Sequence, residues 1–250
     1  MRADQALVSR GLAPSRSAAA RLIGDGAVHA GLGAQRRLIS RAAATVHDDE
    51  PMEVTESDET RYVSRAGAKL AGALRHVGLD PAGLTVLDVG TSTGGFSDCL
   101  LQAGAARVVG VDVGHDQLHP RLRHDRRLWL LEGVNARQLD RAMLAGSMPA
   151  EGFGLIVADL SFISLTLVLP AVLPLAARPG RLLALVKPQF ELDAAALDAR
   201  GVVRDPRLYE RVRARMDECI AALGWRIDDY FDSPLPGGDG NREFFMDCSR

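Results

Sequence analysis

Cysteine is scarce in this 250-residue sequence, and its cysteines form no metal-binding motif. The three cysteines, Cys99, Cys219 and Cys248, are scattered and lack the CxxC spacing of a zinc site, which fits a protein of a reducing compartment. The first ten residues contain no apolar signal core. We therefore expect a cytoplasmic protein without a bound metal.

Long apolar runs are also rare, and only one stretch is long and apolar enough to be considered as a membrane-spanning segment. Residues 160–177 are eighteen residues without a charge, slightly fewer than the ~20 that span a bilayer. Pro170 and Pro174 interrupt this stretch, and its first half carries hydroxyl side chains. The pattern indicates a loop followed by a helix against a sheet, so we expect no membrane association.

Lysine is almost absent, because 28 of the 30 basic residues are arginine and only Lys69 and Lys187 are lysine. Arginine cannot lose its proton in a protein, whereas lysine is a compact amine whose pKa of ~10.4 can be lowered. The two lysines could remain by chance. The alternative is that they mark positions that need an amine, and Lys187 ends an apolar run of buried type, LALVK.

The net charge of −2 hides an uneven distribution of charge along the chain. Residues 1–47 hold seven arginines and two aspartates, a net charge of +5, whereas residues 48–60 hold seven acids and no base. A second basic stretch follows at 61–79. A basic N-terminal module followed by an acidic connector favours RNA binding over a chance arrangement.

The basic module has the pattern of two helices followed by short strands. Apolar spacing predicts helices at 2–10 and 16–26, with Gly11 ending the first and Ser15 capping the second. Three short strands are predicted to follow, at 27–31, 36–40 and 51–54.

The segment RADQALVSRGLAPSRSAAARLIGDGAVHAG resembles the RNA-binding domain of ribosomal small-subunit protein four. The resemblance implies a small α+β RNA-binding domain, which we place with its acidic connector at 1–59. The arginines expected to contact RNA are Arg2, Arg16, Arg21 and Arg65.

From residue 84 onward, apolar runs of strand type alternate with longer segments. These runs lie at 84–90, 107–113, 127–133, 153–160, 181–188, 225–233 and 243–249. Strands separated by helix-length segments indicate a doubly wound, Rossmann-like α/β sheet. We place this second domain at 60–250.

A glycine-rich loop, DVGTSTGGFS, follows the first of these strands. Its spacing is not that of a dinucleotide-binding GxGxxG loop, although its glycines allow a ligand to approach the backbone closely. Asp112 ends the second strand 22 residues after Gly90, where an acid usually binds ribose hydroxyls. This combination favours S-adenosylmethionine as cofactor, the alternative being that Asp88 and Asp112 merely end strands. Expected cofactor contacts are Gly90, Ser92, Thr93, Gly94, Gly95, Phe96, Asp112, Asn135 and Asp159.

Charged residues also end later strands. Asp159 ends the fourth strand and Lys187 the fifth, and both should lie at the carboxyl edge of the sheet, where ligands bind. Lys69 lies on a predicted helix before the first strand, and Glu243 opens the last strand. We predict that these four side chains form one cluster.

Six segments together resemble the TlyA family: SRAGAKL, DVGTSTGGFS, VGVDVGHDQL, VADLSFISL, LVKPQFE and SPLPGGDGNREFF. The resemblance covers nearly the whole chain. It implies an FtsJ-like, S-adenosylmethionine-dependent ribose 2′-O-methyltransferase domain, with a seven-stranded, mostly parallel sheet whose last strand is antiparallel. The implied catalytic tetrad is Lys69, Asp159, Lys187 and Glu243.

The resemblance also implies a cytidine ribose in ribosomal RNA as substrate, and the short C-terminus favours large-subunit RNA over small-subunit RNA. We expect a monomer that meets its RNA within a ribosomal subunit. Lys187 either takes the proton of the target hydroxyl or stays charged and stabilises the developing alkoxide. The sequence leaves both roles open.

Three other functions compete with this interpretation. A ribosome-assembly factor with an inactive catalytic domain is disfavoured by the complete tetrad. A haemolysin, a label that the family also carries, is disfavoured because no basic amphipathic helix with aromatic anchors is present. A small-molecule methyltransferase is disfavoured by the arginine-rich N-terminal module.

Overall fold

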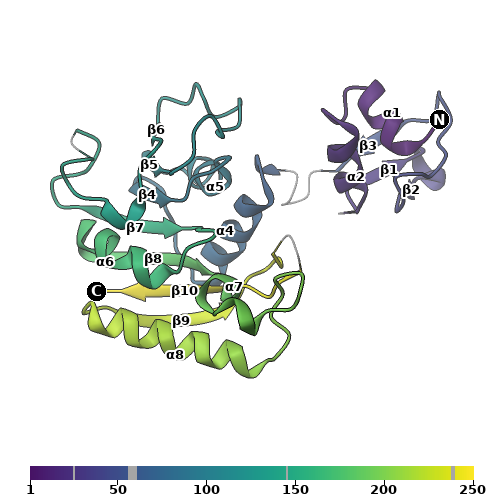
Figure 1. Ribbon diagram of the computed structural model, residues 1–250. Coiled ribbons are helices and arrows are strands. Elements are labelled where there is room, and N and C mark those ends of the chain that lie inside the picture. The colour runs from purple at the N-terminus through teal and green to yellow at the C-terminus, as the bar shows by residue number, and fades with distance from the viewer. Residues whose placement is uncertain (25, 56–60, 145, 238–239) are drawn as a thin grey trace. The chain divides into compact units, whose positions relative to one another are not determined.

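The computed structural model describes residues 1–24, 26–55, 61–144, 146–237 and 240–250. The chain forms two compact units, Met1–Arg61 and Tyr62–Arg250 (Figure 1). The predicted domain boundary between residues 59 and 60 lies outside the described residues.

The first unit combines two helices with a three-stranded antiparallel sheet of order β2-β1-β3. Its elements are α1 (Ala3–Ser9), α2 (Arg16–Gly24), β1 (Val28–Ala30), β2 (Arg37–Leu38) and β3 (Met52–Val54), with a 3-10 helix, η1 (Gly33–Gln35). The Ala18 amide donates to Ser15 Oγ at 3.2 Å, and Gly11 has a φ of 71° after α1, which confirms both predicted helix ends. Leu7, Ile23 and Val28 belong to one buried core.

The second unit is built on one seven-stranded sheet of order β6-β5-β4-β7-β8-β10-β9. The strands are β4 (Thr85–Val89), β5 (Arg107–Val111), β6 (Leu128–Leu131), β7 (Phe153–Ala158), β8 (Ala176–Val186), β9 (Arg226–Asp232) and β10 (Phe244–Ser249). Strands β4 to β8 pair in parallel, whereas β10 is antiparallel to both β8 and β9. The predicted mostly parallel sheet with an antiparallel last strand is therefore confirmed.

Helices cover both faces of this sheet (Figure 1). Its helices are α4 (Arg65–His76), α5 (Gly95–Gln102), α6 (Leu165–Val172), α7 (Pro188–Glu191) and α8 (Arg207–Ala222), with 3-10 helices η2 (Ala136–Gln138), η3 (Leu173–Leu175) and η4 (Ala194–Ala196). Val86 packs in one core with α4 and α5, and the next residue, Leu87, packs in the other with α6 and α8. The central parallel strands are largely apolar because both faces of the sheet are covered there.

Two connections differ from the expected helix-length pattern. Turns link β5 to β6, and turns with η2 link β6 to β7 in the described residues. Pro120 disfavours helical backbone at His119, and the segment between β5 and β6 has few apolar side chains to bury. Residues 160–175 form a loop, α6 and η3, much as predicted, and β8 begins at Ala176. No described helix is long and apolar enough to cross a membrane.

The strand order brings distant parts of the chain to one edge of the sheet. Strand β4 pairs with β5 on one side and with β7 on the other, so the direction of winding changes there, and a crevice opens beyond the strand ends. Strand β10 runs in the opposite direction, and its first residue, Phe244, pairs with Val186, the last residue of β8. The residue before β10 therefore lies at the same edge as the residues after β4, β7 and β8.

Candidate active site

The glycine-rich loop between β4 and α5 has no room for a side chain at two positions. Gly90 has a φ of 88°, and a Cβ there would lie 2.4 Å from the carbonyl oxygen of Asp159. Gly94 has a φ of 92°, and a Cβ there would lie 2.4 Å from a methyl carbon of Leu122. Both positions require glycine, and the loop backbone lies directly against the end of β7.

Asp112 holds the glycine-rich loop with both of its carboxylate oxygens. Its Oδ2 accepts a hydrogen bond from the Ser92 amide at 2.7 Å, and its Oδ1 accepts one from the Gly114 amide at 2.7 Å. A carboxylate offers about four lone-pair directions, so each oxygen can still accept a ribose hydroxyl. Asp112 thus fixes the loop as well as ending β5, and Ser92 adopts a left-handed φ of 48° beside it.

Two cavities open at this edge of the sheet. The larger, of about 580 Å³, has a volume usual for small-ligand sites. The smaller, of about 120 Å³, adjoins it and shares Gly90, Ser92 and Asp159 with it. The predicted cofactor residues that line at least one of the two are Gly90, Ser92, Thr93, Gly95, Phe96, Asp112, Asn135 and Asp159. Gly94 lines neither and instead precedes the first residue of α5.

The two lysines form two separate ion pairs. Lys187 Nζ lies 2.6 Å from Asp159 Oδ1 and donates to Ser161 Oγ at 3.0 Å. Lys69 Nζ donates to Glu243 Oε2 at 2.5 Å, and Glu243 is 4% exposed. Lys187 and Asp159 line the smaller cavity, whereas Lys69 and Glu243 line neither cavity. Within the predicted group of four, one ion pair lines the smaller cavity and the other is buried beside the start of β10, and a single catalytic cluster stays a prediction.

Asp88 is a buried carboxyl group near the base of the glycine-rich loop. The sequence did not identify it as a site residue. Ser97 Oγ donates to Asp88 Oδ2 at 2.6 Å, and Oδ1 has no hydrogen-bond partner among the described residues. Burial raises the pKa of Asp88 to about 7, the nearby carboxylates of Asp159 and Asp112 add to this rise, and the Ser97 hydrogen bond opposes it. The one sequence signal was an acid inside the apolar run TVLDV.

Phe162 was also missed by the sequence analysis. It lines the larger cavity, is 91% exposed and has a φ of 63°, a conformation that aromatic residues rarely adopt. Its ring packs against Phe190, with 5.0 Å between ring centroids. An exposed, strained aromatic residue beside a cavity is a candidate for contact with a planar ligand.

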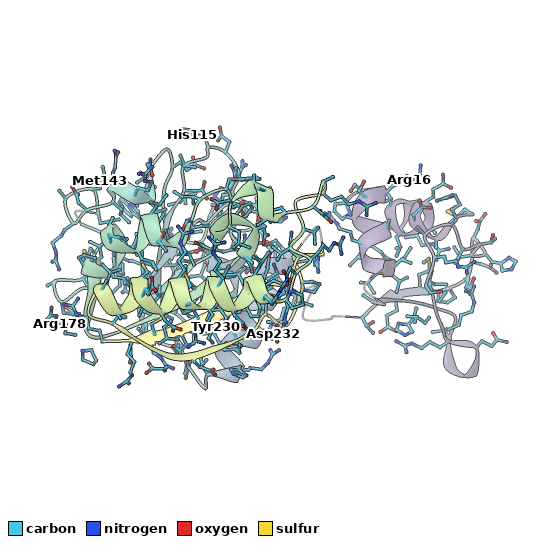
Figure 2. The ribbon with its side chains drawn as sticks, turned by 60° about the horizontal axis from the view of Figure 1, so that its bottom comes forward. Arg16, His115, Met143, Arg178, Tyr230 and Asp232 are labelled. Carbon is cyan, nitrogen blue, oxygen red and sulfur yellow. The ribbon has the colours of Figure 1, made fainter. Side chains whose placement is uncertain are left out.

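The arginines predicted to contact RNA are arranged unequally. Asp4, which is 3% exposed, accepts hydrogen bonds from Arg2 at 2.9 Å and from Arg16 at 2.9 Å, and Arg16 projects from the first unit (Figure 2). Arg21 is exposed on α2, and no described contact joins it to them. Arg65 opens α4 in the second unit and is half-buried. Asp4 therefore brings together two of the four.

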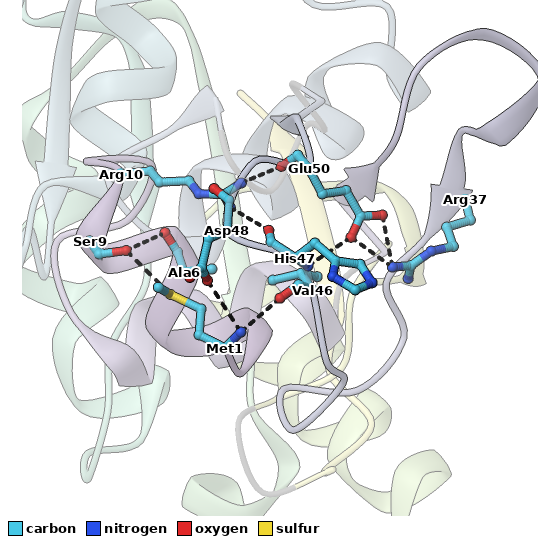
Figure 3. A network of polar contacts seen from close by, with 9 residues as sticks. All are labelled: Met1, Ala6, Ser9, Arg10, Arg37, Val46, His47, Asp48 and Glu50. Carbon is cyan, nitrogen blue, oxygen red and sulfur yellow. Dashed lines mark hydrogen bonds and ion pairs between the residues drawn. The ribbon is translucent and has the colours of Figure 1, made fainter.

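Part of the acidic connector belongs to the first unit. Arg37 donates to both carboxylate oxygens of Glu50, and Arg10 donates to the backbone carbonyls of His47 and Asp48 (Figure 3). These contacts tie residues 47–50 to β2 and to the residue that follows α1, and the Arg37–Glu50 ion pair neutralises part of the basic charge of the module.

The fold and the site define a class of protein. A doubly wound sheet with a glycine-rich loop at its switch point, an acid after the next strand and a large cavity between them binds a nucleoside-type cofactor. With the antiparallel β10 beside β8, this is the architecture of the Rossmann-like methyltransferases.

The comparison with known proteins gives the family. The FtsJ-like methyltransferase family matches residues 62–249. The protein named 16S/23S rRNA (cytidine-2′-O)-methyltransferase TlyA of Mycobacterium tuberculosis strain H37Rv is 44% identical over 246 residues, which are 98% of this chain and 88% of that protein. Hemolysin A of Brachyspira hyodysenteriae is 35% identical over 244 residues, 98% of each chain. The chain therefore belongs to the FtsJ-like methyltransferases and, among them, to the TlyA family.

A solved structure agrees with this assignment. A protein of Streptococcus thermophilus, named as a candidate hemolysin, superposes with a TM-score of 0.74 at 33% identity. The match covers 100% of this chain and 88% of the other.

Proposed function

We propose that this protein is a methyltransferase that uses S-adenosylmethionine to methylate the 2′-hydroxyl of a cytidine ribose in ribosomal RNA. The observation that carries the proposal is the Lys187–Asp159 ion pair, which lies in the wall of the smaller cavity, beside the larger one. Family membership supports it, since the Mycobacterium tuberculosis relative is named for this reaction on 16S and 23S RNA.

The larger cavity fits the proposed cofactor. Asp112 presents carboxylate oxygens to ribose hydroxyls, Asn135 presents an amide to a base, and Gly90 leaves the loop backbone uncovered. The sulfonium of this cofactor supplies a methyl group that an oxygen nucleophile can accept by in-line displacement. The smaller cavity, which Lys187 lines, is then the place for the acceptor hydroxyl.

Lys187 acts on the acceptor through its ammonium group. Nζ forms an ion pair with Asp159 Oδ1 at 2.6 Å and donates a hydrogen bond to Ser161 Oγ at 3.0 Å, so two oxygen partners hold its position. A charged amine held beside the hydroxyl stabilises the negative charge that develops on the oxygen as the methyl group is transferred and the hydroxyl proton passes to water. We therefore favour the charged stabiliser over the neutral base. Lys69 and Glu243 act from behind the cavity wall, as a buried pair that fixes the start of β10 relative to α4.

We infer that RNA affinity comes largely from the first unit, in which Asp4 holds Arg2 and Arg16 together while Arg21 is exposed on α2. Arg65, at the start of α4, is placed to add a contact from the methyltransferase unit. Action as a monomer on RNA within a ribosomal subunit stays a prediction of the sequence.

The test is to map ribose methylation by mass spectrometry on both ribosomal RNAs after incubation with the protein and labelled cofactor. We expect one or more 2′-O-methylcytidines with the wild type and none with Lys187→Arg, whose wide planar group keeps the charge but loses the compact amine. Calorimetry should show that this variant still binds the cofactor. The control is Arg178→Lys, an exposed position near the amino end of β8 (Figure 2). Full methylation by Lys187→Arg would contradict the proposal for the lysine.

A further inference from the structure

Two segments beyond the strand ends carry the residues of the proposed reaction, and the second of them includes α7. The segment 159–164 follows β7 and contains Asp159, and the segment 187–191 follows β8 and contains Lys187. Neither segment is a regular strand, so the strand pairing between β7 and β8 does not extend to them. The paired strands bring Asp159 and Lys187 to the same edge of the sheet, and contacts between the two segments beyond the strands can fix how the two side chains meet at 2.6 Å.

Glu191 makes that connection with both of its carboxylate oxygens. Oε2 accepts from Ser164 Oγ at 2.5 Å, and Oε1 accepts from the Leu165 amide at 2.7 Å. Glu191 is 3% exposed, so water does not compete for these hydrogen bonds. The carboxylate thus binds the first turn of α6, which begins directly after the segment that carries Asp159.

Arg215 of α8 reinforces the same connection from the other side. It donates to the Glu191 carbonyl oxygen at 2.6 Å and to Thr166 Oγ1 at 3.3 Å. Thr166 belongs to the first turn of α6, and its hydroxyl lies 2.7 Å from Ser164 Oγ. Four side chains, those of Ser164, Thr166, Glu191 and Arg215, therefore take part in one network between the segment after β7 and the segment after β8.

We propose that Glu191 is a positioning residue of the methyltransferase: its carboxylate fixes the segment after β8 to the start of α6 and thereby holds Lys187 against Asp159. Glu191 lines neither cavity and touches no proposed substrate. It acts through the lysine, which lies four residues earlier in the chain. This role rests on the proposed function, because it concerns the alignment of the proposed catalytic pair.

The hydrogen-bond pattern distinguishes two substitutions. Glu191→Gln keeps an acceptor for the Leu165 amide, and its NH₂ group can donate to Ser164 Oγ, whose proton then turns to Thr166 Oγ1. Glu191→Ala removes both hydrogen bonds and releases the two segments. A matched control is Asp247→Ala, which removes a carboxylate that is 2% exposed and is paired with Arg181, away from the carboxyl end of β8.

The experiment compares steady-state methyl transfer to ribosomal RNA by the full-length wild type and the three variants. For Glu191→Ala we expect kcat to fall by roughly 10²-fold with KM for RNA little changed, since misplacement by about 1 Å has an effect of this order. Glu191→Gln should stay close to the wild type. Hydrogen exchange should rise at the start of α6 in Glu191→Ala only. The idea is wrong if Glu191→Ala keeps its kcat, if Glu191→Gln loses as much activity, or if Asp247→Ala loses as much.

Two further measurements distinguish a failure of the proposal for Glu191 from a failure of the proposed function. Ser164→Ala removes one of the two hydrogen bonds, so it should reduce kcat less than Glu191→Ala does, and it tests the connection if Glu191→Ala does not fold. If the wild type fails to methylate RNA, the proposed function fails. In that case the exchange at α6 still decides whether Glu191 joins the two segments.

Discussion

Replacing Asp88 by asparagine should change how the stability of the methyltransferase unit depends on pH. Asp88 is fully buried, and one of its two carboxylate oxygens has no described hydrogen-bond partner. Its pKa is about 7 in the folded protein, because burial disfavours the charged form. An aspartate in the unfolded chain has a pKa of about 3.9.

The sign of the effect follows from these two values. Below about pH 4 both states are protonated, and Asp88 adds no pH dependence. Between about pH 4 and pH 7 the unfolded chain loses the proton while the folded protein keeps it, so the free energy of unfolding falls as pH rises. The total fall in the free energy of unfolding is roughly 4 kcal/mol, since a pKa difference of one unit corresponds to about 1.4 kcal/mol. Between about pH 5 and pH 8 the expected loss is about 2–3 kcal/mol.

Urea unfolding followed by tryptophan fluorescence measures this quantity for the second unit. Both tryptophans, Trp129 and Trp225, lie in Tyr62–Arg250. The free energy of unfolding should be determined at about pH 5 and about pH 8 for the wild type and for Asp88→Asn. Asparagine does not titrate, and groups distant from Asp88 titrate alike in both proteins, so their contributions cancel in the comparison.

We expect the wild type to lose about 2–3 kcal/mol more than Asp88→Asn between the two pH values. An equal pH dependence in the two proteins would refute the reasoning, because Asp88 would then be ionised in the folded protein at pH 5. A loss that is larger in the variant would refute it as well.

Three other predictions concern ligands. Asp112→Ala should weaken S-adenosylmethionine binding by about 10-fold or more, because charged hydrogen bonds are worth roughly 1.5–3 kcal/mol each. If calorimetry showed an unchanged affinity, Asp112 would not be a cofactor ligand. Arg16→Ala combined with Arg21→Ala should lower the salt slope of RNA binding by roughly 1.4–1.8, with cofactor affinity unchanged; an unaltered slope in filter binding would exclude both as phosphate contacts. Phe162→Ala should lower kcat/KM for RNA by roughly 5- to 100-fold if the ring stacks on a base. An unchanged kcat/KM would assign the ring to packing against Phe190.

The sequence was a good guide to the strands and to the edge where the site lies. Buried parallel strands are apolar throughout, and a charged residue directly after such a run marks the strand end, as Asp159 and Lys187 do. Because these two strands are neighbours, the contact between the two side chains could be expected before the structure was known. Glu243 was placed near them because it opens the last strand, and the antiparallel direction of β10 brings that residue to the same edge.

Features that depend on side-chain direction could not be predicted in the same way. Glu191 looked like one more acid after Lys187, and nothing in the sequence showed that its carboxylate binds the start of α6. The arginines of the first unit were counted as free charge, but Asp4 and Glu50 pair with three of them, Arg2, Arg16 and Arg37. Net charge along a sequence does not reveal which charges neutralise one another in space.

The position of β10 has a consequence for how the protein folds. This strand follows all the others in the chain, yet it lies between β8 and β9, so β9 can join the sheet only through it. The Lys69–Glu243 contact joins residues 174 positions apart, and closing so long a loop is slow, as it is for folds dominated by distant contacts. We expect the sheet to be completed only when β10 inserts. A nascent chain that lacks these residues would then hold Lys69 without its carboxylate partner, and catalytic competence would arise at the end of folding.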